Sequence, residues 1–128
     1  MRERIAKRLA NEESGFTLIE LLVVVIIIGI LLAIAIPSYL TFKDRANKAA
    51  AQANVRSAVP GVEAYAADNG GYTGMTVVAL QGIDAGIKNV AVVGTPTATT
   101  YCIQNADTTG YTYSKAGPQA DITPAACT

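Results

Sequence analysis

The sequence has no histidine and no tryptophan, and its 128 residues include only two cysteines, six tyrosines and two phenylalanines. Without histidine, the chain lacks the commonest general base and the commonest metal ligand. Ten basic and ten acidic residues balance to zero net charge, so there is no electrostatic case for nucleic-acid binding. No phosphate-binding glycine loop, Ser-His-Asp set or metal-ligand cluster is evident, and we therefore expect neither an enzyme nor a cofactor or metal site.

What the chain does have is one long apolar run, from Phe16 to Ile36, with a single ionisable residue in it, Glu20. As a helix at about 1.5 Å per residue, this run covers about 30 Å, the thickness of a bilayer's hydrocarbon core. Leu, Ile and Val surround the whole helix rather than one stripe, and the rest of the chain is too small to bury it. We therefore expect residues 16–37 to lie in lipid or in a bundle of identical helices.

Glu20 is the anomaly in this run, because a carboxylate in a membrane segment is costly and usually has a partner. No basic residue lies between Phe16 and Phe42. One interpretation is that Glu20 reaches the headgroups from a position near the helix end. The other requires a cation from elsewhere, and cleavage between Gly15 and Phe16 would create one, a new α-amino group four residues from Glu20.

Residues 1–15 form a polar leader with four basic residues before the apolar run, as in a charged n-region. An ordinary secretory signal is cut after its apolar run, whereas here a small residue, Gly15, stands before it. Cleavage at Gly15 would leave the apolar helix on the mature protein. The alternative is that the leader is an amphipathic extension of an uncleaved anchor.

Several motifs occur together in order along the first part of the chain. Gly15 is followed by F-T-L-I-E, and the run contains Gly29 and ends in I-A-I-P at Pro37; then come Y-x-x-F, an alanine-rich helix and E-A-Y-A-A-D-N-G-G-Y at residues 63–72. In these motifs the chain resembles the type IV prepilins and the pseudopilins, over roughly residues 1–75. The resemblance implies the pilin fold, an α+β fold in which a long N-terminal helix packs against a small antiparallel sheet.

The resemblance also implies roles for single residues. A prepilin peptidase would cut between Gly15 and Phe16 and methylate the Phe16 amine. Glu20 would meet that amine in a neighbouring subunit and set the axial register of a filament. Between Gly29 and Pro37 the helix would lose its helicity when subunits pack together.

A location before and after assembly follows from the same resemblance. The precursor would span the inner (cytoplasmic) membrane once with its N-terminus inside, and pilus assembly machinery would move it into an extracellular filament of identical subunits. The charges alone leave orientation open, because four basic residues precede the span and three follow it closely, namely Lys43, Arg45 and Lys48.

Residues 38–75 read as an amphipathic helix and a loop. Apolar residues recur there at spacings of three and four, namely Val55, Ala58, Val59, Val62, Tyr65 and Ala66. Pro60-Gly61 interrupts this pattern and predicts a kink or a break. The segment D-N-G-G-Y-T-G at residues 68–74 predicts a loop rather than a calcium site. Thr76 is expected to cap a short helix over Val77–Gly82, with Leu80 and Ile83 pointing inward.

Residues 76–128 predict a C-terminal globular region with three strands, at 89–94, 97–104 and 110–115, followed by an irregular tail. One face of this antiparallel meander would pack on the amphipathic helix. Tyrosines at strand and helix spacing are expected to pack in the core or at its edge rather than to form an adhesive surface.

Cys102 and Cys127 are interpreted as one disulfide that fixes the tail to the second strand. It would close a loop of about 25 residues and contribute on the order of 3–4 kcal/mol in the loop-entropy model. Two free thiols and a redox pair are the alternatives, although redox pairs are usually closer in sequence. A disulfide would place the C-terminal region outside the cytoplasm.

Three functions are compatible with these features. The first is a structural subunit of a type IV pilus. The second is a pseudopilin of a type II secretion system, a group that often has a calcium site in its C-terminal region, where this chain has few acids. The third, from another class, is a monomeric membrane-anchored binding module, which would need neither cleavage at Gly15 nor a charge at Glu20.

Overall fold

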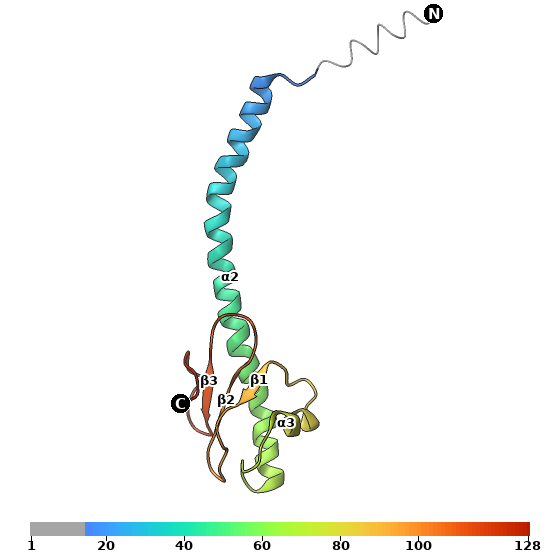
Figure 1. Cartoon of the computed structure of the whole chain (residues 1–128), viewed down its shortest axis with the longest axis vertical. Coiled ribbons are helices and arrows are strands. Elements are labelled where there is room, and N and C mark those ends of the chain that lie inside the picture. The colour runs from blue at the N-terminus through green and yellow to red at the C-terminus, as the bar shows by residue number, and fades with distance from the viewer. Residues whose placement is uncertain (1–14) are drawn as a thin grey trace, which may run out of the picture. The chain divides into compact units, whose positions relative to one another are not determined.

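The computed structural model describes residues 15–128, so the predicted leader, apart from Gly15, lies outside the described residues. The elements in this part of the chain are α2 (Leu18–Asn69), α3 (Val77–Ile83), β1 (Val90–Val92), β2 (Tyr101–Asn105) and β3 (Ser114–Gly117) (Figure 1). Contacts divide the chain into two compact units that meet between Thr41 and Phe42. The first unit contains the apolar half of α2, and the second contains the rest of α2 and all later elements. The α+β fold class is confirmed.

Helix α2 is 52 residues long and continues through Pro60 and Gly61, so the predicted break at this dipeptide is wrong. Proline removes one backbone hydrogen bond and crowds the carbonyl four residues earlier, which belongs to Arg56. Pro60 lies on the exposed side of α2, where water can solvate that carbonyl. Gly61, about 100° further around the helix, is buried, and a Cβ there would overlap the Ile87 side chain. The free energy gained by packing the Gly61 side of α2 against the core outweighs the loss of the one backbone hydrogen bond that Pro60 removes.

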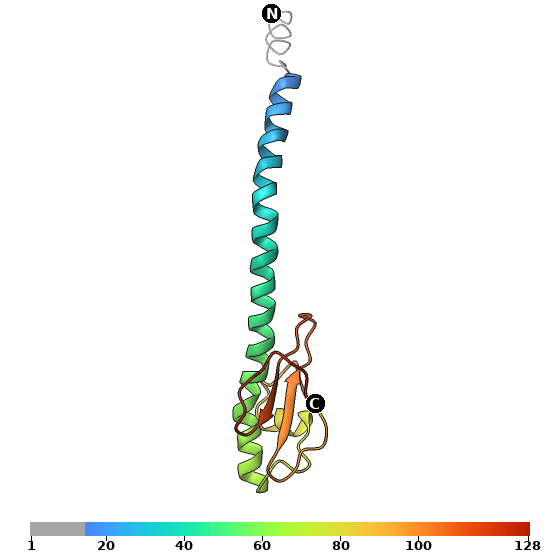
Figure 2. The same ribbon diagram turned by 90° about the vertical axis from the view of Figure 1, so that its left-hand side faces the viewer.

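The sheet is an antiparallel meander in the order β1-β2-β3. In the register, Ala91 lies opposite Gln104, and Ile103 lies opposite Val92 on one side and Lys115 on the other. Thr123, in the tail, forms an isolated bridge with Ser114, so part of the predicted irregular tail extends the sheet. Both views place the sheet and α3 alongside the last part of α2 (Figures 1 and 2).

The core of the second unit joins the amphipathic face of α2 to α3 and the sheet. Its largest fully buried side chains are Val55, Val62, Leu80, Ile87 and Ile103, and Ala58 is fully buried as well. Val59, Tyr65 and Ala66 pack against this cluster from its edge. The predicted apolar face of α2 is therefore confirmed, with three residues fully buried and three partly buried.

Helix α3 has the predicted N-cap, because the Thr76 hydroxyl accepts a hydrogen bond from the Ala79 N–H at 3.2 Å. Leu80 is buried as expected, but Ile83 is 43% exposed, so the prediction that Ile83 points inward is wrong. Residues three positions apart lie only about 60° from each other around a helix, so their spacing does not separate Leu80 from Ile83. Ile83 is the last residue of α3, where the chain leaves the helix, and its side chain is less covered there than that of Leu80.

Strand β1 begins one residue later than predicted, and β2 and β3 each begin four residues later. Residues 97–100 form a turn instead, in which the Thr97 hydroxyl accepts a hydrogen bond from the Thr100 N–H at 3.0 Å. Threonine side chains that bond to nearby backbone offer the chain an alternative to a strand. Strand β3 starts at Ser114 rather than near Gly110, because a side-chain network described below holds the preceding loop.

Candidate functional site

Glu20 lies in the first turn of α2, and Gly15 and Phe16 immediately precede that turn. Thr17 and Glu20 form a reciprocal cap: the Thr17 N–H donates to Glu20 Oε2 at 2.8 Å, and the Glu20 N–H donates to Thr17 Oγ1 at 3.3 Å. This is the capping-box arrangement, in which two unpaired helix N–H groups are satisfied at once. This capping box was not predicted above, although the T-x-x-E spacing at residues 17–20 is its usual signature.

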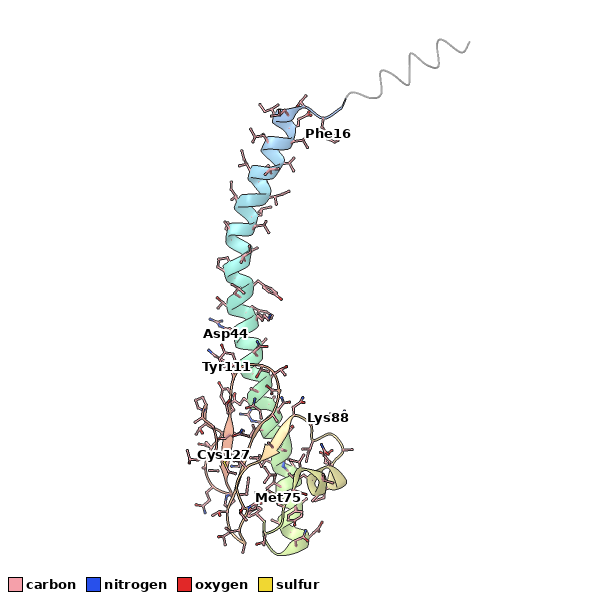
Figure 3. The ribbon with its side chains drawn as sticks, viewed as in Figure 1. Phe16, Asp44, Met75, Lys88, Tyr111 and Cys127 are labelled. Atoms are coloured by element: carbon pink, nitrogen blue, oxygen red, sulfur yellow. A yellow bond between two sulfur atoms is a disulfide. The ribbon has the colours of Figure 1, made fainter. Side chains whose placement is uncertain are left out.

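The capping box marks the start of α2, and two residues, Phe16 and Thr17, lie between the predicted cleavage position and the first helical residue, Leu18. Gly15 and Phe16 precede the first helical residue, Leu18, and have no helix or strand assignment. The Phe16 side chain is 84% exposed, and nothing lies within 4 Å of the position that a Cβ on Gly15 would occupy. Figure 3 shows Phe16 at this end of the described chain. The peptide bond between Gly15 and Phe16 is therefore outside the helix and open to solvent.

Glu20 has no cationic partner among the described residues. The one ion pair in residues 15–128 joins Lys48 to Asp44 at 2.9 Å, one turn apart on α2. Glu20 is exposed, as are its apolar neighbours. Its carboxylate is thus satisfied by the Thr17 N–H, while its charge remains available for a cation from another source.

The apolar half of α2 buries none of its large side chains. From Leu18 to Ile36 they are between 48% and 82% exposed. Side chains project from all sides of this part of the helix (Figure 3). By length and composition, α2 is the one described helix able to cross a membrane. Such a surface needs lipid or another protein to cover it.

The helix remains continuous from Gly29 to Pro37, the stretch predicted to open in a filament. Nothing lies within 4 Å of a Cβ built on Gly29. Pro37 has no N–H to donate, and its own carbonyl accepts a hydrogen bond from the Thr41 hydroxyl at 3.0 Å. The predicted opening concerns packed subunits, so it remains a prediction.

The two cysteines are joined in a disulfide. Cys102, in β2, is bonded to Cys127, with Cα atoms 5.9 Å apart and a separation of 25 residues. The Cys127 N–H also donates to Gln104 Oε1 at 3.1 Å. The tail is therefore fixed to β2 by a covalent bond and a hydrogen bond.

A polar network that the sequence analysis missed connects the loop between β2 and β3 to α2. Asn54, on α2, donates to Asp107 Oδ2 at 2.6 Å, and Asn105 donates to Asp107 Oδ1 at 3.1 Å. The Thr109 N–H donates to the same Oδ1 at 3.0 Å. Burial alone would raise the pKa of Asp107, but these hydrogen bonds outweigh it and hold the pKa below its usual value. No local sequence signal links Asn54 to Asp107, which are 53 residues apart.

Within residues 15–128, no three His, Cys, Asp or Glu side chains lie close enough together to hold a metal ion. Tyr72 and Tyr101 are buried, and Tyr65 and Tyr113 lie against the core, as predicted. Tyr111 is half-buried outside this cluster, with the Lys48 amino group 5.0 Å from its ring centroid.

The chain is similar to known proteins over much of its length. A family model described as the prokaryotic N-terminal methylation motif matches residues 11–36. The type IV wide pilus major component PilA4 of Thermus thermophilus is 39% identical over 98 residues, which cover 77% of this chain and 69% of that protein. The type IV major pilin protein PilA of Myxococcus xanthus is 35% identical over 114 residues, covering 77% and 51%.

A third relative belongs to a secretion system. The type II secretion system core protein G of Pseudomonas aeruginosa is 35% identical over 78 residues, which cover 61% of this chain and 52% of that protein. The chain therefore spans about half the length of the second and third relatives. No solved structure matches the chain.

The methylation motif and the uncovered apolar helix define a class of proteins that carry this motif at the start of a hydrophobic N-terminal helix. Within that class, the chain belongs to the family of type IV pilins and pseudopilins.

Proposed function

We propose that this chain is a structural subunit of a type IV pilus. The observation that carries the proposal is the uncovered apolar half of α2, directly after the methylation motif. A surface of this size exposed to water would drive aggregation, because apolar area removed from water contributes about 25 cal/mol per Å². In the membrane lipid covers it, and in a filament the same helices of other subunits cover it.

Processing would precede assembly. A prepilin peptidase would cut between Gly15 and Phe16 and methylate the new amine of Phe16. This peptide bond lies before the helix and is exposed to solvent, which supports the proposal that a peptidase can reach it. Before assembly the subunit would span the inner membrane with its N-terminus inside, and assembly machinery would then transfer it to an extracellular, homopolymeric filament.

Glu20 would set the axial register of this filament by pairing with the Phe16 amine of a neighbouring subunit. Its lack of a cationic partner among residues 15–128 supports this role. A charge left unpaired in an apolar bundle is strongly unfavourable, so packing out of register would be selected against.

Two substitutions at Glu20 separate its charge from its cap. Glu20→Ala removes both, whereas Glu20→Gln keeps a side chain that can cap Thr17, since glutamine also serves in capping boxes. We expect both variants to insert in the membrane and both to give at least tenfold less filament in the sheared fraction. Normal filament yield from Glu20→Gln would show that the charge does not set the register.

A pseudopilin of a type II secretion system is the second candidate, favoured by the similarity to core protein G. Against it, the Asp107 carboxylate in the loop between β2 and β3 already accepts hydrogen bonds from Asn54, Asn105 and Thr109, which leaves it few free positions for a metal ion. A pseudopilin would build a short structure that stays in the cell envelope.

The deciding experiment is the intact mass of the protein in filaments sheared from whole cells. We expect a chain that begins at Phe16, carries one added methyl group and lacks two hydrogens because of the disulfide. A processed chain that remains in the membrane fraction would favour the pseudopilin. A chain that retains Met1 would favour the membrane-anchored binding module.

A further inference from the structure

A short segment of α2 just after the apolar run is positively charged. Residues 37–50 carry three basic side chains and one acidic side chain. One of the basic residues, Lys48, is already engaged, because its amino group lies 2.9 Å from the Asp44 carboxylate and 5.0 Å from the centroid of the Tyr111 ring. Figure 3 shows Asp44 and Tyr111 at the same level of α2. Lys48 and Asp44 neutralise each other, so the net positive charge of this segment belongs to its two other basic residues.

Lys43 and Arg45 are these two residues, and we call them the basic collar. Both are exposed, and neither forms an ion pair within residues 15–128. Residues two positions apart lie about 200° from each other around a helix, so the two cations lie on nearly opposite sides of α2. A protein that docks on one side of the helix can reach only one of them. A ligand that surrounds the helix can reach both.

The collar lies at the depth of the lipid headgroups when the apolar run fills the hydrocarbon core. Along the helix, Lys43 and Arg45 follow Ile36 by about 10 and 14 Å. The headgroup layer on each side of a bilayer is about 5–8 Å thick. Long side chains on a helix lean toward its N-terminus, so both cations extend back toward this layer. Tyr39, between the span and the collar, is 63% exposed and supplies the amphipathic ring that is typical of a membrane interface.

We propose that the basic collar binds the phosphate groups of anionic phospholipids in the leaflet at the Ile36 end of the span. The occupant is lipid because lipid surrounds a single span on every side and its negative headgroups complement both cations. Each basic residue near an anionic surface strengthens binding about fivefold. The contact fixes the depth of the span and keeps Phe42 and the residues after it out of the hydrocarbon core. This proposal rests on the membrane stage of the proposed function and does not require a filament.

The chain has no tryptophan, so a single introduced tryptophan can report on the lipid beside the collar. Tyr39→Trp places this probe one turn before Lys43, in the same leaflet as the collar. The full chain is reconstituted in vesicles of equal parts phosphatidylglycerol and phosphatidylcholine, and one lipid or the other carries brominated acyl chains that quench tryptophan. Equal quenching means no preference. We expect stronger quenching by brominated phosphatidylglycerol, which corresponds to an enrichment of about fivefold beside the helix.

Removal of charge locates this preference within the chain. Lys43→Gln/Arg45→Gln, made in the Tyr39→Trp chain, should be quenched equally by the two lipids. The matched control, Arg56→Gln/Lys88→Gln, removes the same charge from two exposed residues outside the collar and should keep the preference. The exchange Lys43→Arg/Arg45→Lys retains both charges and should keep it as well. The same tryptophan emission without bromine checks that all variants insert alike.

Every other result overturns the proposal. Equal quenching in the Tyr39→Trp chain would leave the two cations to a protein partner. A preference that survives Lys43→Gln/Arg45→Gln would belong to other groups, and one that the matched control also loses would reflect net charge alone. We expect inorganic phosphate to act no differently from chloride at the same ionic strength. Selective loss of the preference in phosphate would show that the collar binds the free ion instead of lipid.

The vesicle experiment and the filament experiment fail independently. Insertion in vesicles needs no assembly machinery, so a collar without lipid preference would leave the proposed pilus subunit intact. Absence of the chain from sheared filaments would refute the pilus subunit and would not change the quenching in vesicles.

Discussion

At the scale of single residues, two stacked tyrosines differ in how their hydroxyls are satisfied. The Tyr72 and Tyr101 ring centroids are 4.6 Å apart in the core. The Tyr72 hydroxyl donates to Glu63 at 3.1 Å, whereas the buried Tyr101 hydroxyl has no hydrogen-bond partner in the described chain. A buried polar group without a partner costs stability, and its removal can be neutral or favourable.

Phenylalanine substitutions should therefore have different effects at the two positions. We expect Tyr72→Phe to lower the free energy of unfolding by about 1 kcal/mol, and Tyr101→Phe to change it by less than about 0.5 kcal/mol or to raise it. Denaturant unfolding of the processed chain in detergent measures both. A larger loss for Tyr101→Phe would mean that its hydroxyl is bonded in solution.

The same pair predicts a dependence of stability on pH. Burial raises the pKa of both hydroxyls, and the nearby Glu63 raises them further. The pKa of an unperturbed tyrosine is about 10. The stability that the two neutral hydroxyls contribute is therefore complete below about pH 10 and is lost as the pH rises toward their raised pKa values in the folded state. Tyr101→Phe should lose less stability above pH 10 than the wild-type chain does. An equal loss in both would assign the effect to other groups.

Gly117 makes room for the Tyr101 ring across the sheet. The two residues are register partners, and a Cβ on Gly117 would overlap that ring. We expect Gly117→Ala to cost about 1–3 kcal/mol through overpacking. Gly82→Ala is the matched control: Gly82 is helical with open space around it, so alanine should be neutral or stabilise by up to about 1 kcal/mol. Equal effects at the two sites would contradict this account.

At the scale of elements, the tail and the loop between β2 and β3 are held by contacts rather than by regular structure. The disulfide fixes the tail to β2, and Thr123 exchanges two backbone hydrogen bonds with Ser114. The bond between Asn54 and Asp107 fixes the loop to α2. Long-range contacts of this kind determine where β3 can begin.

Removal of the disulfide should loosen the tail while α2 remains folded. We expect the double variant Cys102→Ser/Cys127→Ser to lose on the order of 3–4 kcal/mol, as the loop-entropy model gives for a loop of about 25 residues. Hydrogen exchange should become faster at Ser114 and Thr123 and should not change in the buried face of α2. Unchanged exchange at Thr123 would show that the tail holds without the bond.

At the scale of the whole molecule, the chain combines a unit with a buried core and a helix whose apolar surface no described residue covers. The unit with the buried core can fold on its own contacts, whereas the apolar helix depends on lipid or on other subunits to cover its surface. The stretch from Gly29 to Pro37 lies in this apolar helix, where we expect packing in the filament to decide the conformation.

Amide exchange in intact filaments tests whether this stretch opens. We predict faster exchange from Gly29 to Pro37 than in the flanking turns, because Pro37 already leaves the Ala33 carbonyl without its usual donor. The subunit in detergent serves as the control and should show slow exchange throughout, since α2 is continuous there. Uniformly slow exchange in filaments would refute the opening.

Local patterns in the sequence determined the apolar helix, the amphipathic face of α2, the Thr76 cap and the order of the strands, because each depends on neighbours in the chain. The role of Gly15, Phe16 and Glu20 rests on a motif of the same local kind and remains a prediction. Only the tertiary structure decided that α2 passes Pro60, that β2 and β3 start late, and that Ile83 is exposed. These outcomes depend on contacts between distant residues, such as Gly61 with Ile87 and Asn54 with Asp107, whose packing and hydrogen bonds outweigh local preference.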